Sequence, residues 1–205
     1  MRRYGVIIAD PPWSYRRGGV NGAAAAQYAT MTREELAAIP VPSWTAADAV
    51  LALWGTWPKL DEALHLLTAW GFAYVTGFPW IKTMPHNGEV RRGIGFWTMS
   101  TSELVLIGRR GEPSRRREGK PVLGLLAGED RQFYAPLRRH SEKPQGLHDW
   151  LEAQFDGPFL ELFARQSRQG WDTYGMDLGF ILSAEGVRRI AAPRPAQQLL
   201  FEDVP

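Results

Sequence analysis

Short apolar runs alternate along this chain with segments of helical periodicity, and this alternation limits the folds open to it. Leu60, Leu64 and Leu67 recur at helical spacing, which predicts a helix over Pro58–Trp70. Strands separated by helices in this way are typical of an α/β sheet with mostly parallel strands and helices on its faces. Four runs have the length and composition of buried strands: Tyr4–Ala9, Asp48–Trp54, Glu103–Gly108 and Pro158–Ala164.

Further local signals complete this outline. Thr32 and Glu35 form a Thr-x-x-Glu capping box, which predicts a short helix over Arg33–Ile39. Lys143–Phe155 has apolar residues on one face and is also predicted to be helical. Phe72–Lys82 alternates loosely and is expected to be extended. The length of 205 residues fits one domain followed by a tail.

Composition excludes several classes of site. The chain has no cysteine, so disulfides, thiolate catalysis and cysteine-ligated zinc or iron–sulfur clusters are excluded. The histidines show no metal-ligand spacing, and no metal is expected. No apolar run approaches the roughly 18 residues of a membrane span, and the basic start lacks a signal-peptide core and cleavage site. These features favour a cytoplasmic protein that does not bind a membrane.

The first strand ends in Asp10-Pro11-Pro12-Trp13, at the edge where open α/β sheets bind their ligands. Asp10 is a hydrogen-bond acceptor, the two prolines make a stiff turn with free carbonyls, and Trp13 has a flat apolar face. Together they can hold a planar base that bears an exocyclic amine. The carboxylate and the Pro11 carbonyl would accept from the two amine hydrogens while the indole stacks on the ring. The alternative is a proline-rich turn with a core tryptophan.

Such a site could activate an aromatic amine. The amine is a poor nucleophile because its lone pair is delocalised into the ring. Two fixed acceptors would pull the nitrogen towards a tetrahedral geometry and localise that lone pair, so that it could attack an electrophilic methyl group. This is catalysis by orientation and electrostatics rather than by a strong base.

Other short segments follow the DPPW turn in a defined order. They are YATM at Tyr28–Met31, LALW at Leu51–Trp54, WGF at Trp70–Phe72, WIK at Trp80–Lys82, ELVLIGRRG at Glu103–Gly111, RRHSEKP at Arg138–Pro144, ELFAR at Glu161–Arg165 and GWDTYG at Gly170–Gly175. Together they resemble the adenine amino-methyltransferases with a DPPW motif. That family includes the catalytic subunit of the eukaryotic mRNA adenosine methyltransferase and bacterial and phage enzymes. The resemblance covers nearly all of Tyr4–Leu178.

The resemblance implies a Rossmann-like methyltransferase that uses S-adenosylmethionine, with the target-amine motif before the cofactor motif in a permuted order. The cofactor strand would be Phe159–Ala164, and no G-x-G-x-x-G follows the first strand. Lys143 would meet the methionine carboxylate of the cofactor. The residues implied to bind the cofactor are Ala9, Asp10, His140, Lys143, Phe163, Arg165 and Asp177.

This chain differs from the family pattern at Met176, and the resemblance ends near Leu178. Met176 stands where many members have an Asn that is expected to hold ribose hydroxyls, and Asp177 is expected to take over that role. The predicted order weakens after Leu178. A methyltransferase domain is therefore expected over residues 1–178, with a tail over residues 179–205.

The implied substrate is adenine in nucleic acid, with DNA favoured. In duplex DNA the base would flip out to reach Asp10, and Trp13 would replace the lost stacking. Tyr28 would lie beside the acceptor pocket, with a packing role as the alternative. RNA is the alternative substrate, because the eukaryotic members act on RNA. A further alternative is a catalytically weak nucleic-acid-binding scaffold, which Met176 favours and the intact DPPW motif opposes.

A basic segment covers Arg109–Lys120. Its six basic and two acidic residues give it a charge of +4, whereas the whole chain has a net charge of +2. Within it, Arg115, Arg116 and Arg117 are predicted to contact phosphates of the nucleic acid. The alternative is an ordinary solvated loop.

The tail ends in a short apolar motif at residues 197–201. Gln197, Leu200 and Phe201 resemble the peptide by which bacterial replication and repair proteins bind the DNA sliding clamp. Leu200 and Phe201 could fill an apolar pocket while Gln197 bonds at its rim. The alternative is that these residues fold back onto the enzyme or pair with a second subunit.

Overall fold

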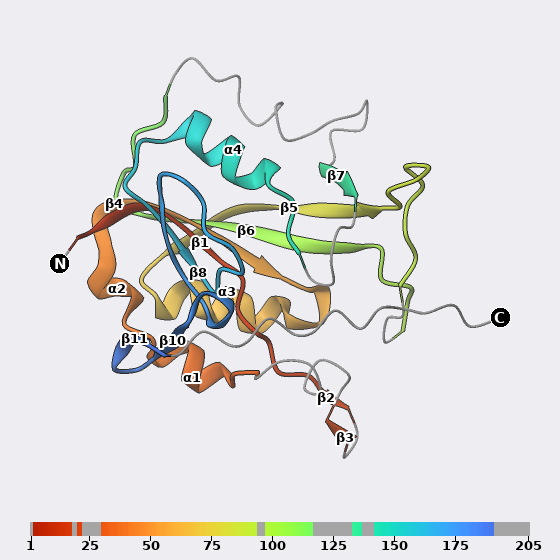
Figure 1. Ribbon diagram of the computed structural model, residues 1–205, viewed down its shortest axis with the longest axis horizontal. Helices are drawn as coiled ribbons and strands as arrows, with labels where there is room; N and C mark the ends of the chain where they lie inside the picture. Colours follow the sequence, from red (N-terminus) through yellow and green to blue (C-terminus); the bar gives the residue numbers. More distant parts are fainter. Residues whose placement is uncertain are drawn as a thin grey trace.

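The computed structural model describes residues 2–17, 20–21, 30–93, 97–116, 133–136 and 142–190. Within these residues, a seven-stranded sheet has the strand order β7-β5-β6-β4-β1-β8-β9 (Figure 1). Its strands are β1 (Tyr4–Ala9), β4 (Thr45–Gly55), β5 (Ala73–Thr83), β6 (Ser102–Arg110), β7 (Phe133–Pro136), β8 (Phe159–Leu162) and β9 (Trp171–Tyr174). The helices are α1 (Arg33–Ala38), α2 (Val41–Trp44), η1 (Trp57–Lys59), α3 (Leu60–Ala69), α4 (Gly146–Gln154) and η2 (Met176–Leu178).

The sheet is mixed but mostly parallel. β1 runs parallel to β4 and β8, β8 to β9, and β5 to β7. β6 runs antiparallel to both of its neighbours, β4 and β5. The α/β class and the mostly parallel sheet are confirmed. The antiparallel direction of β6 has a local cause. Thr83, at the end of β5, forms an antiparallel bridge with Val90, and Gly93 forms one with Ser100. The described residues of this connection contain no crossover helix, so the chain returns in the opposite direction.

Helices cover both faces of the sheet. In Figure 1, α4 lies on one face, and α1 and α3 lie on the other. Because side chains alternate along a strand, β1 supplies both cores. Ile7 packs into the core that contains Leu67 of α3, and Val6 and Ile8 pack into the core that contains Trp150 of α4. The strand is therefore buried on both faces, as its unbroken apolar run predicts.

The local helix signals are reproduced in the structure. The Thr32 hydroxyl accepts from the Glu35 amide at 3.2 Å, and the Glu35 carboxylate accepts from the Thr32 amide at 2.7 Å, so the capping box is confirmed. α4 begins at Gly146 rather than at Lys143, because a residue before proline is disfavoured in the helical conformation and Pro144 follows Lys143. Among the described residues, no helix is long and apolar enough to cross a membrane.

Several described elements were not predicted from sequence. β7 and β9 are strands of four residues each, too short to give a clear alternation. After Leu178 the chain forms the hairpin of β10 (Phe180–Ser183) and β11 (Gly186–Arg189), and Leu182 of this hairpin is buried in the core at 5% exposure. A second small hairpin joins β2 (Arg16–Arg17) and β3 (Val20–Asn21).

The strand directions bring distant segments to one edge of the sheet. Asp10 follows β1, Thr56 follows β4, and Phe163 follows β8. Because β6 runs antiparallel to β4, its first residues, Ser102 and Glu103, lie at the same edge. This carboxyl edge therefore gathers side chains from the beginning, middle and end of the chain.

Candidate active site

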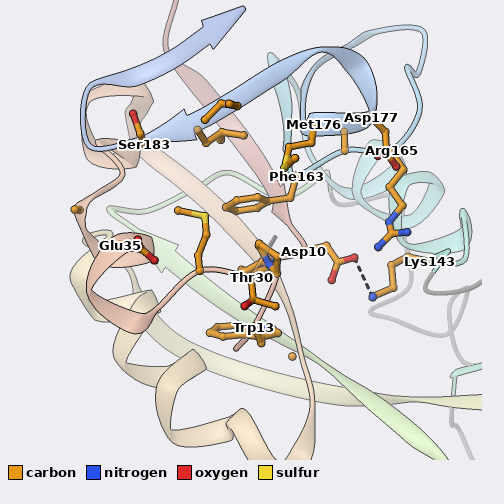
Figure 2. A pocket seen from close by; sticks show the side chains of 18 of the residues that line it. Asp10, Trp13, Thr30, Glu35, Lys143, Phe163, Arg165, Met176, Asp177 and Ser183 are labelled. Atoms are coloured by element: carbon orange, nitrogen blue, oxygen red, sulfur yellow. Dashed lines mark ion pairs between the residues drawn. The ribbon is translucent and has the colours of Figure 1, made fainter. Parts of the chain in front are cut away.

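A cavity of about 700 Å³ opens at the carboxyl edge (Figure 2), within the size range of small-molecule sites. In Figure 2 the Asp10 carboxylate faces Lys143, and the ring of Phe163 lies between Asp10 and Met176. The hairpin β10–β11 forms one wall. A second cavity, of about 400 Å³, shares Asp10, Lys143, Phe163 and Arg165 with the first. The two chambers therefore meet at these four side chains.

Backbone hydrogen bonds hold the DPPW turn. The Asp10 amide donates to the Leu162 carbonyl at 3.3 Å, which ties the turn to the end of β8. The Pro11 carbonyl accepts from the Trp13 amide, and the Pro12 carbonyl accepts from the Met31 amide, both at 2.9 Å. The expectation that these carbonyls are free was wrong, because a residue two positions on and a neighbouring segment supply the donors. Each carbonyl oxygen still has a second lone pair that can accept.

Trp13 has a structural role that the sequence did not reveal. Its side chain is 7% exposed and packs into the core beneath the cavity. Its indole N–H donates to the Trp54 carbonyl at 3.2 Å. The part of the ring that remains accessible lines the cavity. Trp13 is therefore a core tryptophan that also borders the cavity.

Four charged side chains form a continuous chain at the site. Lys143 Nζ lies 2.9 Å from Asp10 Oδ2 and 3.2 Å from Glu103 Oε2. Lys82 Nζ lies 2.6 Å from Glu103 Oε1. The side chains of Asp10, Glu103, Lys143 and Lys82 are at most 20% exposed. Two carboxylates and two ammonium groups balance one another, so this charge array is neutral as a whole.

The array controls the ionisation of its members. Burial raises the pKa of Asp10, and the ammonium of Lys143 opposes that effect. Burial also acts to raise the pKa of Glu103, but Lys143 and Lys82 outweigh it and the pKa is lowered. The pKa of Lys143 is raised, because the two carboxylates outweigh the effect of its burial. Lys143 is therefore charged, and its charge limits the rise of the Asp10 pKa that burial causes.

The wall opposite Asp10 is tightly packed. Phe163 has φ of 64°, a left-handed conformation that is uncommon for a residue other than glycine and is found at functional sites. The Ala164 amide donates to the Tyr174 carbonyl at 3.0 Å. A Cβ on Gly175 would lie 2.1 Å from the Ala164 carbonyl oxygen, so only glycine fits there. This packing sets the position of Phe163, Arg165 and Asp177 on the wall.

Most of the site residues expected from sequence lie together. The cavity is lined by Asp10, Pro11, Pro12, Trp13, Lys143, Phe163, Arg165 and Asp177. Ala9 is fully buried at the end of β1, directly before the turn. Met176, the departure from the family pattern, also lines the cavity and is 49% exposed. Tyr28, Arg117 and His140 lie outside the described residues.

Arg115 and Arg116 are not brought to the cavity. They follow the end of β6, which is at the edge of the sheet opposite Asp10 because β6 is antiparallel to β4. The Arg115 guanidinium donates to Gln154 at 3.0 Å, and Arg116 pairs with Asp156. The structure therefore places these two arginines away from the cavity, and their contacts with phosphates stay a prediction.

Glu103 and Lys82 were not identified as site residues from sequence. Each stands at one end of an apolar strand, as Asp10 does, and an ionisable residue in that position was the available signal. The hairpin residues 181–185, which line the cavity, had no such signal. Their position depends on how the chain folds back after β9.

The architecture defines a class of protein. An α/β sheet with an Asp-Pro-Pro-Trp turn beside a ligand-sized cavity at its carboxyl edge is the arrangement expected of an adenine amino-methyltransferase. The family model described as MT-A70 matches residues 4–177, and the chain belongs to this family. MT-A70 methyltransferases use S-adenosylmethionine as the methyl donor.

Individual relatives support the same assignment. The type II methyltransferase M.MunI of Mycoplasma is 33% identical over 86% of this chain and 78% of its own length. The N(6)-adenosine-methyltransferase MT-A70-like protein of Arabidopsis thaliana is 30% identical over 90% of this chain. The human N(6)-adenosine-methyltransferase catalytic subunit METTL3 is 27% identical over 87% of it. The matches cover 25% and 29% of these two eukaryotic proteins, which are much longer.

Substitutions of Trp13 should separate its packing from its hydrogen bond. Trp13→Phe keeps most of the buried surface but leaves the Trp54 carbonyl without its donor, so the free energy of unfolding should fall by about 1–3 kcal/mol. Trp13→Ala also creates a cavity and should cost about 3–5 kcal/mol. Urea unfolding measures both. Trp97→Ala is the matched control, because that side chain is 100% exposed. Equal stabilities of Trp13→Ala and the control would contradict the core role.

Proposed function

We propose that this chain transfers the methyl group of S-adenosylmethionine to the exocyclic amino group of adenine in DNA. The observation that carries the proposal is the Asp10 carboxylate at the junction of two chambers, directly before Pro11 and Pro12. One chamber can receive the base and the other part of the cofactor, with Asp10 between them. DNA is favoured because of the type II methyltransferase M.MunI, a DNA enzyme. Its match to this chain covers 78% of its own length.

The residues present fit the cofactor. The smaller chamber is lined by ionisable groups that include Lys143, Glu161 and Arg165, which suits the charged amino-acid end of the molecule. The larger chamber offers the apolar surfaces of Phe163 and Met176 with Asp177 beside them, which suits a nucleoside. When bound, S-adenosylmethionine supplies a methyl group attached to a positively charged sulfur. Ala9 and Asp10 form the backbone next to this space, and Asp177 is the proposed partner of the ribose.

The turn can orient the target amine. Lys143 binds Oδ2 of Asp10, and the other carboxylate oxygen can accept from one amine hydrogen. The second lone pair of the Pro11 carbonyl can accept from the other. Because these acceptors are held by the array and by backbone hydrogen bonds, they need no reorganisation when the base arrives. In duplex DNA the adenine flips out of the helix to reach them.

Lys143 has two roles in this proposal. Its ammonium group has three N–H donors. Two of them meet Asp10 and Glu103, and we assign the third to the cofactor's carboxylate. A single side chain would then lower the pKa of the acceptor carboxyl group and hold one end of the methyl donor.

Replacement of Asp10 should abolish transfer without unfolding the protein. Asp10→Asn removes the negative charge and one acceptor, so the single-turnover rate should fall at least about a hundredfold, the effect of deleting one preorganised group in comparable sites. Labelled cofactor with duplex DNA, single-stranded DNA and RNA measures rate and substrate class together. Asp61→Asn on the exposed side of α3 is the control. Preferred methylation of RNA would contradict the DNA proposal, and an active Asp10→Asn would contradict the role of Asp10.

Removal of Lys143 should change the pH dependence of catalysis. Burial raises the pKa of Asp10 and Lys143 opposes it, so Lys143→Met should raise that pKa further. Because catalysis needs the carboxylate, the acid limb of the kcat/KM profile should move to higher pH. Rates at saturating cofactor separate this effect from weaker cofactor binding. Lys82→Met, which removes a partner of Glu103 only, should move the limb less. An unmoved limb in Lys143→Met would contradict the electrostatic role.

Several expectations from the sequence are not tested by the structure or the comparisons and stay predictions. The division at residue 178 is one, although Leu182 of the following hairpin packs into the core. Phosphate contacts by Arg115, Arg116 and Arg117, a pocket role for Tyr28, cofactor binding by His140 and a cytoplasmic setting are others. The same holds for the permuted, Rossmann-like motif order.

Clamp docking is a separate prediction, because Gln197, Leu200 and Phe201 lie outside the described residues. A titration of the full chain against a purified bacterial sliding clamp tests it. Binding at micromolar concentrations that is lost in the double variant Leu200→Ala, Phe201→Ala is the expected result, since these side chains would fill the apolar pocket. Binding that survives the double substitution would contradict the motif.

A further inference from the structure

Trp57 is an exposed tryptophan in a fixed orientation beside the cavity. It begins η1 directly after Thr56, which lines the cavity. Its side chain is 53% exposed, yet its indole N–H donates to the hydroxyl of Ser102 at 2.9 Å. Ser102 is 8% exposed and directly precedes Glu103 of the charge array. The bond therefore holds one edge of the indole at the rim of the site and leaves much of the ring open to solvent.

The exposure of Trp57 is unusual in this molecule. Seven of the nine tryptophans are buried at 9% exposure or less. The other two are Trp57 and Trp97, the latter fully exposed, and both belong to segments at the carboxyl edge. Exposed apolar surface that is concentrated in one region marks an interaction site. The buried tryptophans need no partner, whereas these two present aromatic surface to solvent.

Residues 84–93 and 97–101, between β5 and β6, form an arm that projects from the end of the sheet (Figure 1). Gly93 and Ser100 exchange backbone hydrogen bonds of 2.8 and 2.9 Å, and the Arg91 amide donates to the Lys82 carbonyl at 2.7 Å. Arg91 and Arg92 are exposed. Within the described part of the chain, neither guanidinium has a carboxylate partner. The arm thus offers two positive charges and the Trp97 side chain.

The arm is close enough to Trp57 to contact the same duplex. Ser102 pairs with Ile81 on β5, and the next residue, Lys82, binds the backbone of Arg91. The Lys82 amide also donates to the carbonyl of Thr101, the residue before Ser102, at 3.0 Å, so the two segments meet at Lys82. The Arg91 backbone and Ser102, which binds the Trp57 indole, therefore lie beside the same end of β5.

We propose that Trp57 stacks on the base next to the flipped adenine, and that Arg91 and Arg92 bind the flanking phosphates. This inference rests on the proposed DNA methylation. A flipped base leaves its neighbours without a stacking partner, and an aromatic face beside the pocket replaces it. Trp13 supplies little of this surface, because its indole is buried and its N–H is bound to Trp54. The stacking expected of Trp13 concerns the flipped adenine, whereas Trp57 would stack on the neighbouring base that remains in the duplex.

The test of stacking compares paired and unpaired targets. Trp57→Ala should reduce single-turnover methylation of duplex DNA by about ten- to a hundredfold, the usual effect of losing one aromatic–base stack. Single-stranded DNA has no base pair to open, so the loss there should be smaller. Trp57→Phe keeps an aromatic face and should recover part of the duplex activity. Equal losses on both substrates, or none on the duplex, would overturn the stacking role.

A fluorescent base reports the contact directly. With 2-aminopurine beside the target adenine, wild-type protein should quench the fluorescence that flipping would otherwise release, and Trp57→Ala should not. The same emission from both proteins would overturn the proposal. If wild-type protein binds S-adenosylmethionine but does not methylate DNA, the proposed function itself fails. Methylation by wild type with an unaffected Trp57→Ala variant overturns the inference alone.

The phosphate contacts are tested by salt dependence. The double variant Arg91→Ala, Arg92→Ala should flatten the dependence of log affinity on log salt by up to about two contacts, equally for different DNA sequences. The matched control is Arg188→Ala, Arg189→Ala, which removes two exposed arginines from β11. If the dependence of log affinity on log salt changed in the Arg188, Arg189 control but not in the Arg91, Arg92 variant, the proposed phosphate contacts of the arm would be overturned.

Discussion

The buried chain of charges from Asp10 through Lys143 and Glu103 to Lys82 is the interaction on which the site depends. Removing four charges from water is costly, and the cost is offset only when each charge meets a partner at hydrogen-bonding distance. Here every contact in the chain lies between 2.6 and 3.2 Å. An apolar cluster would stabilise the fold as well or better. The array therefore holds the Asp10 carboxyl group in a fixed orientation beside the cavity, and the ammonium group of Lys143 opposes the rise in the Asp10 pKa.

The array exists because one strand runs against its neighbours. Asp10 ends a strand and Glu103 begins one, so the two acids can share Lys143 only if their strands point in opposite directions with respect to the site. The antiparallel β6 provides this arrangement. The same reversal carries Arg115 and Arg116 to the far edge of the sheet. Sequence periodicity identifies strands but not their directions, which explains why Glu103 was missed as a site residue.

Elements that are determined by residues close together in sequence could be predicted from the sequence. The capping box of α1, the helix α3, the strands β1, β4, β6 and β8 and the DPPW turn depend on residues close together in sequence. The burial of Trp13 and the exposure of Trp57 depend instead on which partner reaches each indole N–H: Trp54 is 41 residues away from Trp13, and Ser102 is 45 residues away from Trp57. Spacing along the chain carries no signal for such pairs.

The two ends of the cavity are built from different parts of the chain. The Asp10 end consists of the DPPW turn and the charge array, all within the segment that matches the MT-A70 model, residues 4–177. The opposite wall includes residues 181–185 of the hairpin, which lie beyond that match. The chemistry of the amine is thus determined by the part of the chain that the family model describes, whereas the shape of the far wall is determined by a segment outside it. A substitution in the hairpin can therefore change what the cavity accepts without touching the acceptor that activates the amine.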